Sequence, residues 1–408
     1  MAENALNTTR DGQDSDVAPR NERRGRLQPS TQTRIRVWAA AAGRCTFCNR
    51  LVAENGELGT EVPIGELAHI VGWGAGSPRG DADLDENARR LVENLILACR
   101  NCHKPIDDGG VVGLYSIQRL MQLKGRHESR IRRLTEIGAD RAAHVVRVVG
   151  LVRGTHPELT RSTVLEAVTS ADLFPQILPN AHWEDIDLDL RSHGRLDSPS
   201  DFRRHAVSID DLAARVNDGV RRDAITRIAL FAVAHIPLLV YLGAKLDDKV
   251  RVLPFQRHRT DGDNPWIWPD EESEPATFSV VSVRSGTRHD RVALLLSLSG
   301  TIRVDELPAS IDSTWTVYEI RPDAPSETGP GLIASQATLA NFEGALRRFL
   351  AMIEERQGKI PSVALFPAIP VSAAIQVGRT LMPQVSPSWR VFDRDDGGTF
   401  MEVLEVTK

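Results

Sequence analysis

The chain has 408 residues, enough for two or three domains, and its 41% hydrophobic and 26% charged residues are typical of a soluble globular protein. It contains no run of eighteen apolar residues and no apolar signal segment, so we expect a cytoplasmic protein with no membrane partner. The net charge of -5 is uneven: residues 1–150 carry 22 basic against 19 acidic side chains, and the remainder carries 28 against 36. This balance argues against nucleic-acid binding by the carboxyl-terminal part.

Residues 1–28 are polar and include a basic cluster, which predicts a disordered tail. A short helix is expected next, because Ser30 or Thr31 can cap its start and Gly43 can end it.

All four cysteines follow in two C-x-x-C pairs, Cys45 with Cys48 and Cys99 with Cys102, separated by fifty residues. Two such knuckles can bring four thiolates to the tetrahedral spacing of a structural zinc ion. Disulfides are the weaker interpretation in a chain without a signal segment, and a redox C-x-x-C would leave the second pair unexplained. We therefore predict structural Zn²⁺.

Polar residues with chemical potential lie inside and just after this frame. His69 lies in an apolar run that predicts a short strand, and Asn94 precedes a second apolar run. His103 and Asp107 share one face if a helix starts near Asn101, and an imidazole with a carboxylate is half of a site for a divalent cation. Each residue alone also has an ordinary structural interpretation, including a zinc ribbon without catalysis.

A long helical pattern runs from Ser116 to Ile137 and carries six basic side chains. This surface suits either a DNA backbone or the acidic part of the same chain, and the pattern does not decide between them.

From about residue 144 the pattern changes to alternating strands and helices, which predicts an α/β domain with a mainly parallel sheet. The expected strands include Ile228–Val233, Val250–Pro254, Phe278–Val283, Val292–Leu298, Trp315–Ile320 and Val363–Phe366, and the expected helices include Phe202–Val216, Pro237–Leu246 and Ala337–Glu355.

This region also repeats weakly: helix, strand, Ile-Pro, a helix with a glycine, then a strand. The two Ile-Pro pairs, Ile236-Pro237 and Ile369-Pro370, stand 133 residues apart, and each proline is expected where a helix begins. Two helix amino ends about a pseudo-twofold axis can converge on one crevice and favour phosphates there.

The candidate ligand contacts lie in polar loops or follow the predicted strands of this region. Arg257 and His258 precede Trp266 and Trp268, and aromatic rings beside basic side chains can stack a base and neutralise phosphate. Burial of the tryptophans in the core is an equally good interpretation. Further candidates are Gly300, Ser372 and Arg379.

The order His, Asn, His inside a C-x-x-C frame resembles the HNH (ββα-metal) nucleases. The resemblance implies that His69 is the general base, that Asn94 fixes the loop that aims it, and that His103 and Asp107 hold a catalytic Mg²⁺ or similar ion. Many HNH enzymes carry a metal-binding residue directly before the base, where this chain has Ala68. Either the ion has fewer protein ligands, or another residue such as Glu66 substitutes.

The carboxyl-terminal half resembles a SAVED domain, a fused pair of CARF-like units that senses cyclic oligonucleotides. The stretches that carry this resemblance are Ala234–Pro237, Trp266–Pro269, Leu294–Gly300 and Leu365–Arg379. The expected architecture is therefore an α+β and α/β multidomain chain. It has a tail at 1–28, an HNH endonuclease domain at 29–140 and a SAVED domain at 141–408.

Together the two resemblances imply an HNH–SAVED nuclease effector of CBASS, the bacterial cyclic-oligonucleotide-based anti-phage systems. They imply that a cyclic di- or trinucleotide, made by a partner CD-NTase-type nucleotidyltransferase, drives self-association into dimers or tetramers. The nuclease domains would then degrade double-stranded DNA with little sequence preference. Two alternatives stay open: a restriction-type HNH endonuclease whose carboxyl-terminal domain reads DNA or a modified base, and a zinc-ribbon DNA-binding adaptor without catalysis.

Overall fold

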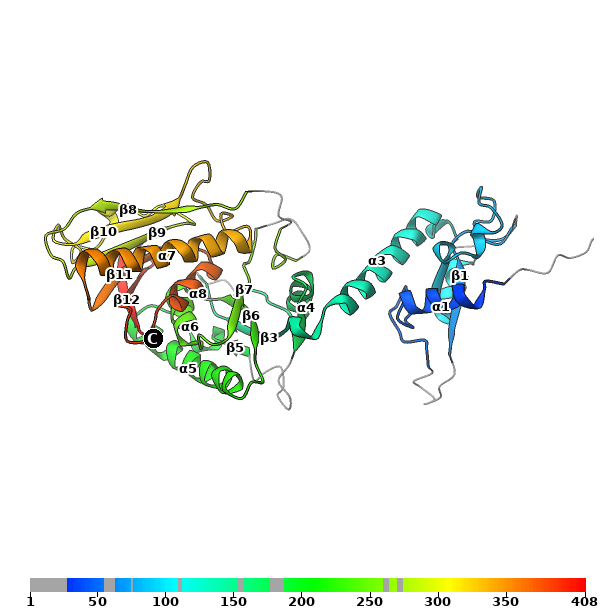
Figure 1. Cartoon of the computed structure of the whole chain (residues 1–408), viewed down its shortest axis with the longest axis horizontal. Helices are drawn as coiled ribbons and strands as arrows, with labels where there is room; N and C mark the ends of the chain where they lie inside the picture. Colours follow the sequence, from blue (N-terminus) through cyan, green and yellow to red (C-terminus); the bar gives the residue numbers. More distant parts are fainter. Residues whose placement is uncertain are drawn as a thin grey trace, which may run out of the picture. The chain divides into compact units, whose positions relative to one another are not determined.

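The structure is a computed structural model that describes residues 28–54, 63–74, 76–108, 112–152, 157–176, 187–259, 264–269 and 274–408. Of the tail expected at 1–28, only the last residue lies within the described part. The chain divides into two compact units between Thr135 and Glu136 (Figure 1). The predicted domain limits of 29–140 and 141–408 stay predictions. In the described part of the chain, no helix is long and apolar enough to cross a membrane.

The amino-terminal unit is built on one hairpin and the helix that follows it. The antiparallel strands place Gly65 opposite Cys99 and His69 opposite Leu95. Gly65 must be small, because a Cβ there would lie 2.6 Å from the Trp38 ring. The elements of this unit are α1 (Thr31–Ala40), β1 (Gly65–His69), β2 (Leu95–Cys99), α2 (Arg100–Ile106) and α3 (Ile117–Glu136).

Local chemistry explains where the first helix begins and ends. The Ser30 hydroxyl accepts the Thr33 amide, as expected of an N-cap, and the chain turns at Gly43 with a φ of 63°. Strand β2 is buried at all five positions, so α2 starts directly from the centre of the small core.

The carboxyl-terminal unit contains two sheets. Strands β4-β3-β6-β7 form a parallel sheet in that order, and β5 also pairs with β3. The other sheet has the order β13-β12-β11-β9-β10-β8, with parallel inner strands and antiparallel edge strands β8 and β13. The predicted, mainly parallel α/β arrangement is confirmed. The strands are β3 (Ala142–Val149), β4 (Phe174–Gln176), β5 (Asp187–Asp189), β6 (Arg227–Val233), β7 (Arg251–Pro254), β8 (Phe278–Arg284), β9 (Val292–Ser297), β10 (Thr316–Pro322), β11 (Ser362–Ala368), β12 (Ser388–Arg394) and β13 (Phe400–Val406).

Helices α5, α6, α7 and α8 contribute to the core between the two sheets, and α7 runs along the six-stranded sheet (Figure 1). Alternate residues of β6 explain the layering: Ile228 and Leu230 face the helices, whereas Ala229 and Phe231 face a separate apolar cluster that includes α4. One core therefore extends through both halves of the repeat. The helices are α4 (Arg161–Ser170), α5 (Pro199–Arg221), α6 (Ile236–Lys245), α7 (Gln336–Gln357) and α8 (Val371–Arg379).

The predicted repeat is present as α5-β6-α6-β7 and α7-β11-α8-β12. Its two short helices meet main chain to main chain. A Cβ on Gly243 would lie 2.1 Å from the Ile375 carbonyl oxygen, and one on Gly378 would lie 1.9 Å from the Val240 carbonyl oxygen. Each glycine thus faces the residue three positions before the other. Pro237 lies in the first turn of α6, but Pro370 is the N-cap of α8 and precedes its first turn.

Candidate metal centre, active site and ligand crevice

The four cysteine sulfurs converge at one point of the amino-terminal unit. All lie within 4.8 Å of one another, and the Cys48 and Cys99 sulfurs are 3.8 Å apart. A tetrahedral ion with metal–sulfur bonds of about 2.3 Å separates its ligands by roughly this distance. No disulfide joins these cysteines. The thiol cluster is therefore compatible with the predicted structural zinc.

Burial and neighbouring thiols disfavour the charged form of Cys102 and raise the pKa of that thiol. A bound cation removes that penalty, because it favours the thiolate form.

Asn94 holds the backbone that leaves His69. Its side-chain oxygen accepts the Val71 amide at 2.8 Å, and its side-chain nitrogen donates to the carbonyl oxygens of Val71 at 2.9 Å and Arg89 at 3.0 Å. The Asn94 carbonyl also accepts the Ile70 amide. The side chain is 3% exposed, so these contacts are kept from water. The His69 ring lies edge-on to Trp73, with centroids 6.2 Å apart.

His103 lies on α2 between two carboxylates. Its Nδ1 is 2.7 Å from Glu66 on β1, and its Nε2 is 3.3 Å from Asp107. Asp107, and then Glu66, raise the pKa of His103, and burial opposes them. Glu66, suggested by the sequence as a substitute for a ligand at Ala68, thus does contact His103.

Arg79 links the backbone of His69 to Asp107, a role that the sequence did not reveal. An arginine in a glycine-rich loop is expected to be exposed. Instead its side chain is only 7% exposed and donates to the carbonyl oxygens of Ile70 at 2.7 Å, Ile106 at 2.8 Å and His69 at 3.3 Å. It also forms an ion pair with Asp107 at 2.7 Å.

The donor set for a catalytic divalent cation is less complete than the thiol cluster. Glu66, His103 and Asp107 offer suitable ligand types, but the carboxylates contact opposite nitrogens of the His103 ring, and Arg79 shares Asp107. Within the described residues, the four cysteines form the one group close enough to hold an ion as they stand. A magnesium ion would require His103 or Asp107 to leave these partners.

In the carboxyl-terminal unit, a cavity of about 490 Å³ lies where α/β sheets usually bind ligands. The chain goes from β3 to β4 on one side and later to β6 on the other, so the strand order reverses between β3 and β6. Gly150 and Leu151 follow β3, and Ala234 and His235 follow β6; all four line this cavity. We call it the switch-point crevice.

The switch-point crevice carries both charges, and most of its ions are already paired. Arg195 contacts Asp396 at 2.8 Å, and His235 at the start of α6 contacts Asp393 of β12 at 3.1 Å. Its lining includes no residue of α8, so the predicted crevice lined by both helix amino ends is not the cavity found here. None of the seven ligand residues predicted from the sequence lines this crevice. The sequence signal that could have located it is the position of its lining residues directly after the predicted strands β3 and β6.

The aromatic candidates lie mainly in the core. Trp266 is 1% exposed and packs on Phe231, with ring centroids 5.4 Å apart, which removes it from any ligand surface. Trp268 is partly buried and faces the His258 ring at 5.1 Å. Burial lowers the pKa of His258 to about 4, which favours the neutral side chain at pH 7. Arg257 is exposed.

The three remaining candidates have different surroundings. Ser372 is fully buried and donates to Gln256, which follows β7, at 2.7 Å. Arg379 donates to the carbonyl oxygens of Asp247 at 3.4 Å and Val250 at 3.1 Å, and it lines a second cavity beside β7. Gly300 follows β9 in open space, where a Cβ would meet nothing within 4 Å.

These features define the carboxyl-terminal unit as a duplicated α/β domain with a crevice at its strand ends. Residues 208–406 match the family model of SAVED, described as the SMODS-associated and fused to various effectors sensor domain. The SAVED resemblance seen in the sequence is confirmed for these residues. The HNH resemblance of the amino-terminal unit stays a prediction.

Solved structures similar to this chain include SAVED/CARF-domain containing Cap4 receptors. The Acinetobacter baumannii Cap4 receptor with the cyclic trinucleotide 2'3'3'-cAAA is 15% identical, with a TM-score of 0.42, and the match covers 60% of this chain and 54% of that one. The Moraxella osloensis Cap4 receptor is 13% identical, with a TM-score of 0.37, covering 71% and 60%. The chain thus spans about half the length of the A. baumannii receptor. No curated protein sequence matches the chain.

Proposed function

We propose that this chain is a DNA endonuclease effector of a CBASS-type anti-phage system. In this proposal a cyclic di- or trinucleotide from a CD-NTase-type partner binds the SAVED domain, and the activated chain self-associates into dimers or tetramers and degrades double-stranded DNA. The SAVED family supports the sensor half, because its domains are fused to various effectors. The amino-terminal unit supplies the effector half.

One observation carries the nuclease assignment. The Arg79 guanidinium contacts the His69 carbonyl oxygen and the Asp107 carboxylate, and Asp107 in turn contacts His103. Through Arg79, the backbone of His69 is therefore linked to Asp107 and His103, which are three of the four residues that the HNH resemblance assigns to catalysis. A structural zinc ribbon needs the four cysteines but not this chain of polar contacts.

The HNH resemblance assigns the roles. His69, at the end of β1, takes the proton from the attacking water, and Asn94 holds the backbone at Val71 so that the imidazole keeps its orientation. His103 and Asp107 would hold a Mg²⁺-type ion at the scissile phosphate after leaving the partners that they contact in the structure. Such an ion, when bound, stabilises the charge that develops on the phosphate.

The test is plasmid cleavage by the full chain with Mg²⁺, screened against a panel of cyclic di- and trinucleotides. We expect degradation with one of them and none without, and we expect His69→Ala to abolish it. His289→Ala is the matched control, because His289 is exposed on the other unit. Retained zinc and an unchanged melting profile in His69→Ala would exclude unfolding as the cause.

Three outcomes contradict this proposal. Cleavage without any cyclic nucleotide would favour the restriction-type alternative. DNA binding without cleavage under every metal and ligand would favour the adaptor, and undiminished cleavage by His69→Ala would remove the assigned base.

A further inference from the structure

The two halves of the SAVED-containing unit differ at one sheet edge. In the second half, β13 pairs with the outer edge of β12 and packs against α5 and α6. In the first half, β7 is the last strand of its sheet, and no described strand pairs with its outer edge. By the order of the repeat, β7 corresponds to β12, α7 to α5 and α8 to α6.

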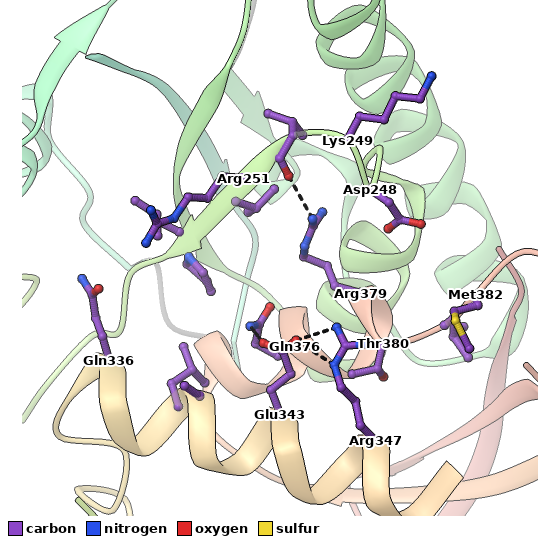
Figure 2. Close-up of a pocket in the computed structure, with 17 residues that line it drawn as sticks. Asp248, Lys249, Arg251, Gln336, Glu343, Arg347, Gln376, Arg379, Thr380 and Met382 are labelled. Atoms are coloured by element: carbon purple, nitrogen blue, oxygen red, sulfur yellow. Dashed lines mark hydrogen bonds and ion pairs between the residues drawn. The ribbon is translucent and has the colours of Figure 1, made fainter. Parts of the chain in front are cut away.

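A cavity of about 720 Å³ occupies the place that corresponds to β13. It is lined by β7 on one side and by residues of α7 and α8 on the other, including Glu343, Arg347, Gln376 and Arg379 (Figure 2). We call it the β7 groove. Its neighbours are the counterparts of the elements that surround β13.

The correspondence extends to a pair of arginines. Val250-Arg251-Val252 aligns with Trp389-Arg390-Val391 in the repeat. Arg390 binds Glu402 of β13, with Nε 3.1 Å from each carboxylate oxygen. Arg251 is exposed and, among the described residues, forms no ion pair.

The remaining charges of the β7 groove are also unbalanced. The lining includes four basic side chains and two carboxylates: Lys249, Arg251, Arg347 and Arg379 against Asp248 and Glu343. Glu343 is held by Arg347 at 2.7 Å and by Gln376 at 2.7 Å, and Asp248 is bound by Lys408. The groove therefore favours an occupant with negative charge.

The edge of β7 offers a short set of backbone partners. Phe255 donates its amide to Leu230 of β6, so the backbone groups of Val252 and Pro254 face the opposite edge. The Val250 carbonyl oxygen already accepts from Arg379. A docking strand would form hydrogen bonds with the Val252 amide and with the carbonyl oxygens of Val252 and Pro254. A short edge with a proline limits indiscriminate pairing, so side chains must supply selectivity.

We infer that the β7 groove binds an extended acidic segment of a partner protein, which adds a strand to β7 as β13 does to β12. The segment alternates apolar residues with glutamate, and one glutamate binds Arg251 as Glu402 binds Arg390. This interaction surface is separate from the switch-point crevice and does not depend on the nuclease assignment.

The probe for this inference is the sequence of residues 400–406, fused to the carboxyl end of a soluble carrier and titrated with the full chain. We expect saturable binding, slower hydrogen exchange at the Val252 amide, and a roughly tenfold or greater loss of affinity in Arg251→Glu. A probe that carries Glu402→Lys and Glu405→Lys should bind the Arg251→Glu variant more tightly than it binds the wild-type chain. Arg288→Glu is the matched control, because Arg288 is exposed and lies outside the groove lining.

Each remaining outcome overturns the inference. No saturable binding up to about 1 mM, or equal binding by wild type and Arg251→Glu, would exclude the proposed recognition. An unchanged Val252 amide during binding would place the probe elsewhere. If the probe fails but sedimentation shows Arg251-dependent self-association, the occupant is a second copy of this chain and not a partner.

Discussion

The two units of this chain are stabilised in different ways. Among its described residues, the amino-terminal unit has two small apolar clusters, one of eight buried residues that include Cys45 and Cys99, and one of three. It adds polar clamps from Arg79, Arg89 and Asn94, which are bonded mainly to backbone carbonyls. The largest apolar core of the carboxyl-terminal unit runs through both halves of the repeat. A small unit thus depends on a few specific groups, whereas a large one depends on close packing.

Removing one thiol should produce the largest effect and should affect the small unit alone. In Cys99→Ser we expect loss of the bound metal and of the amino-terminal melting transition, because structural zinc contributes about 10–16 kcal/mol to such folds. Calorimetry with metal analysis measures both. Met382→Ser, an exposed sulfur in the other unit, is the control. If both transitions survive metal loss, the thiols are not the main support of this unit.

A methyl group at the helix crossing should affect the large unit alone. Gly378→Ala places a Cβ against the Val240 carbonyl oxygen, so the helices must separate, and we expect a loss of roughly 3 kcal/mol or more. Denaturant unfolding measures this loss. Gly344→Ala on α7 is the matched control: its nearest neighbour is the end of the Arg348 side chain at 3.4 Å, and alanine there should stabilise the helix by about 0.5–1 kcal/mol. Similar results for both variants would contradict the close crossing.

Removal of the Asn94 amide tests the polar clamps. Asn94→Ala leaves the Val71 amide and two carbonyl oxygens without their buried partner, and we expect the amino-terminal unit to lose roughly 2–4 kcal/mol. Asn341→Ala in the large unit loses one hydrogen bond, to Ala276, and should cost about 1 kcal/mol. Equal losses would mean that the small unit does not depend on this clamp.

Acid should weaken the large unit through His258. Its folded pKa of about 4 lies below the ordinary value of 6.5, so the unfolded chain binds the proton more tightly. The stability linked to this group is complete above pH 6.5 and falls as the pH drops toward 4, by about 2 kcal/mol at pH 5. Unfolding measured from pH 7.5 to 4.5 should show a shallower loss in His258→Phe. The exposed His289→Phe should keep the wild-type slope.

The sequence predicted most elements because hydrophobic period and capping residues determine them locally. Helix α5 is longer than expected, because Pro199 begins it and the Ser198–Asp201 capping box precedes the apolar pattern. Strand β13 was not predicted. A register shift between Val391 and Phe392 of its partner β12 interrupts the pairing, and β13 itself carries two adjacent buried residues, Val403 and Leu404, which break the alternation.

The candidate sites were predictable where a characteristic spacing of residue types, or a short separation in sequence, indicates proximity. The spacing of the cysteines and of His103 with Asp107 indicated their proximity. The role of Arg79 depends on carbonyl oxygens near residues 70 and 106, which only the folded chain brings together. Trp266 shows the opposite limit, because a tryptophan near arginines suits a ligand surface and a core equally well until its burial is known.

The contact between Gly243 and Gly378 also restricts how the two halves of the repeat can diverge. Most interfaces between duplicated halves tolerate exchange, because a larger side chain on one face can be offset by a smaller one opposite. Here each glycine meets main-chain atoms, which no substitution can shorten. Two positions 135 residues apart are thus held to one residue type by each other's backbone. The surfaces of the two halves can therefore diverge while this junction stays the same.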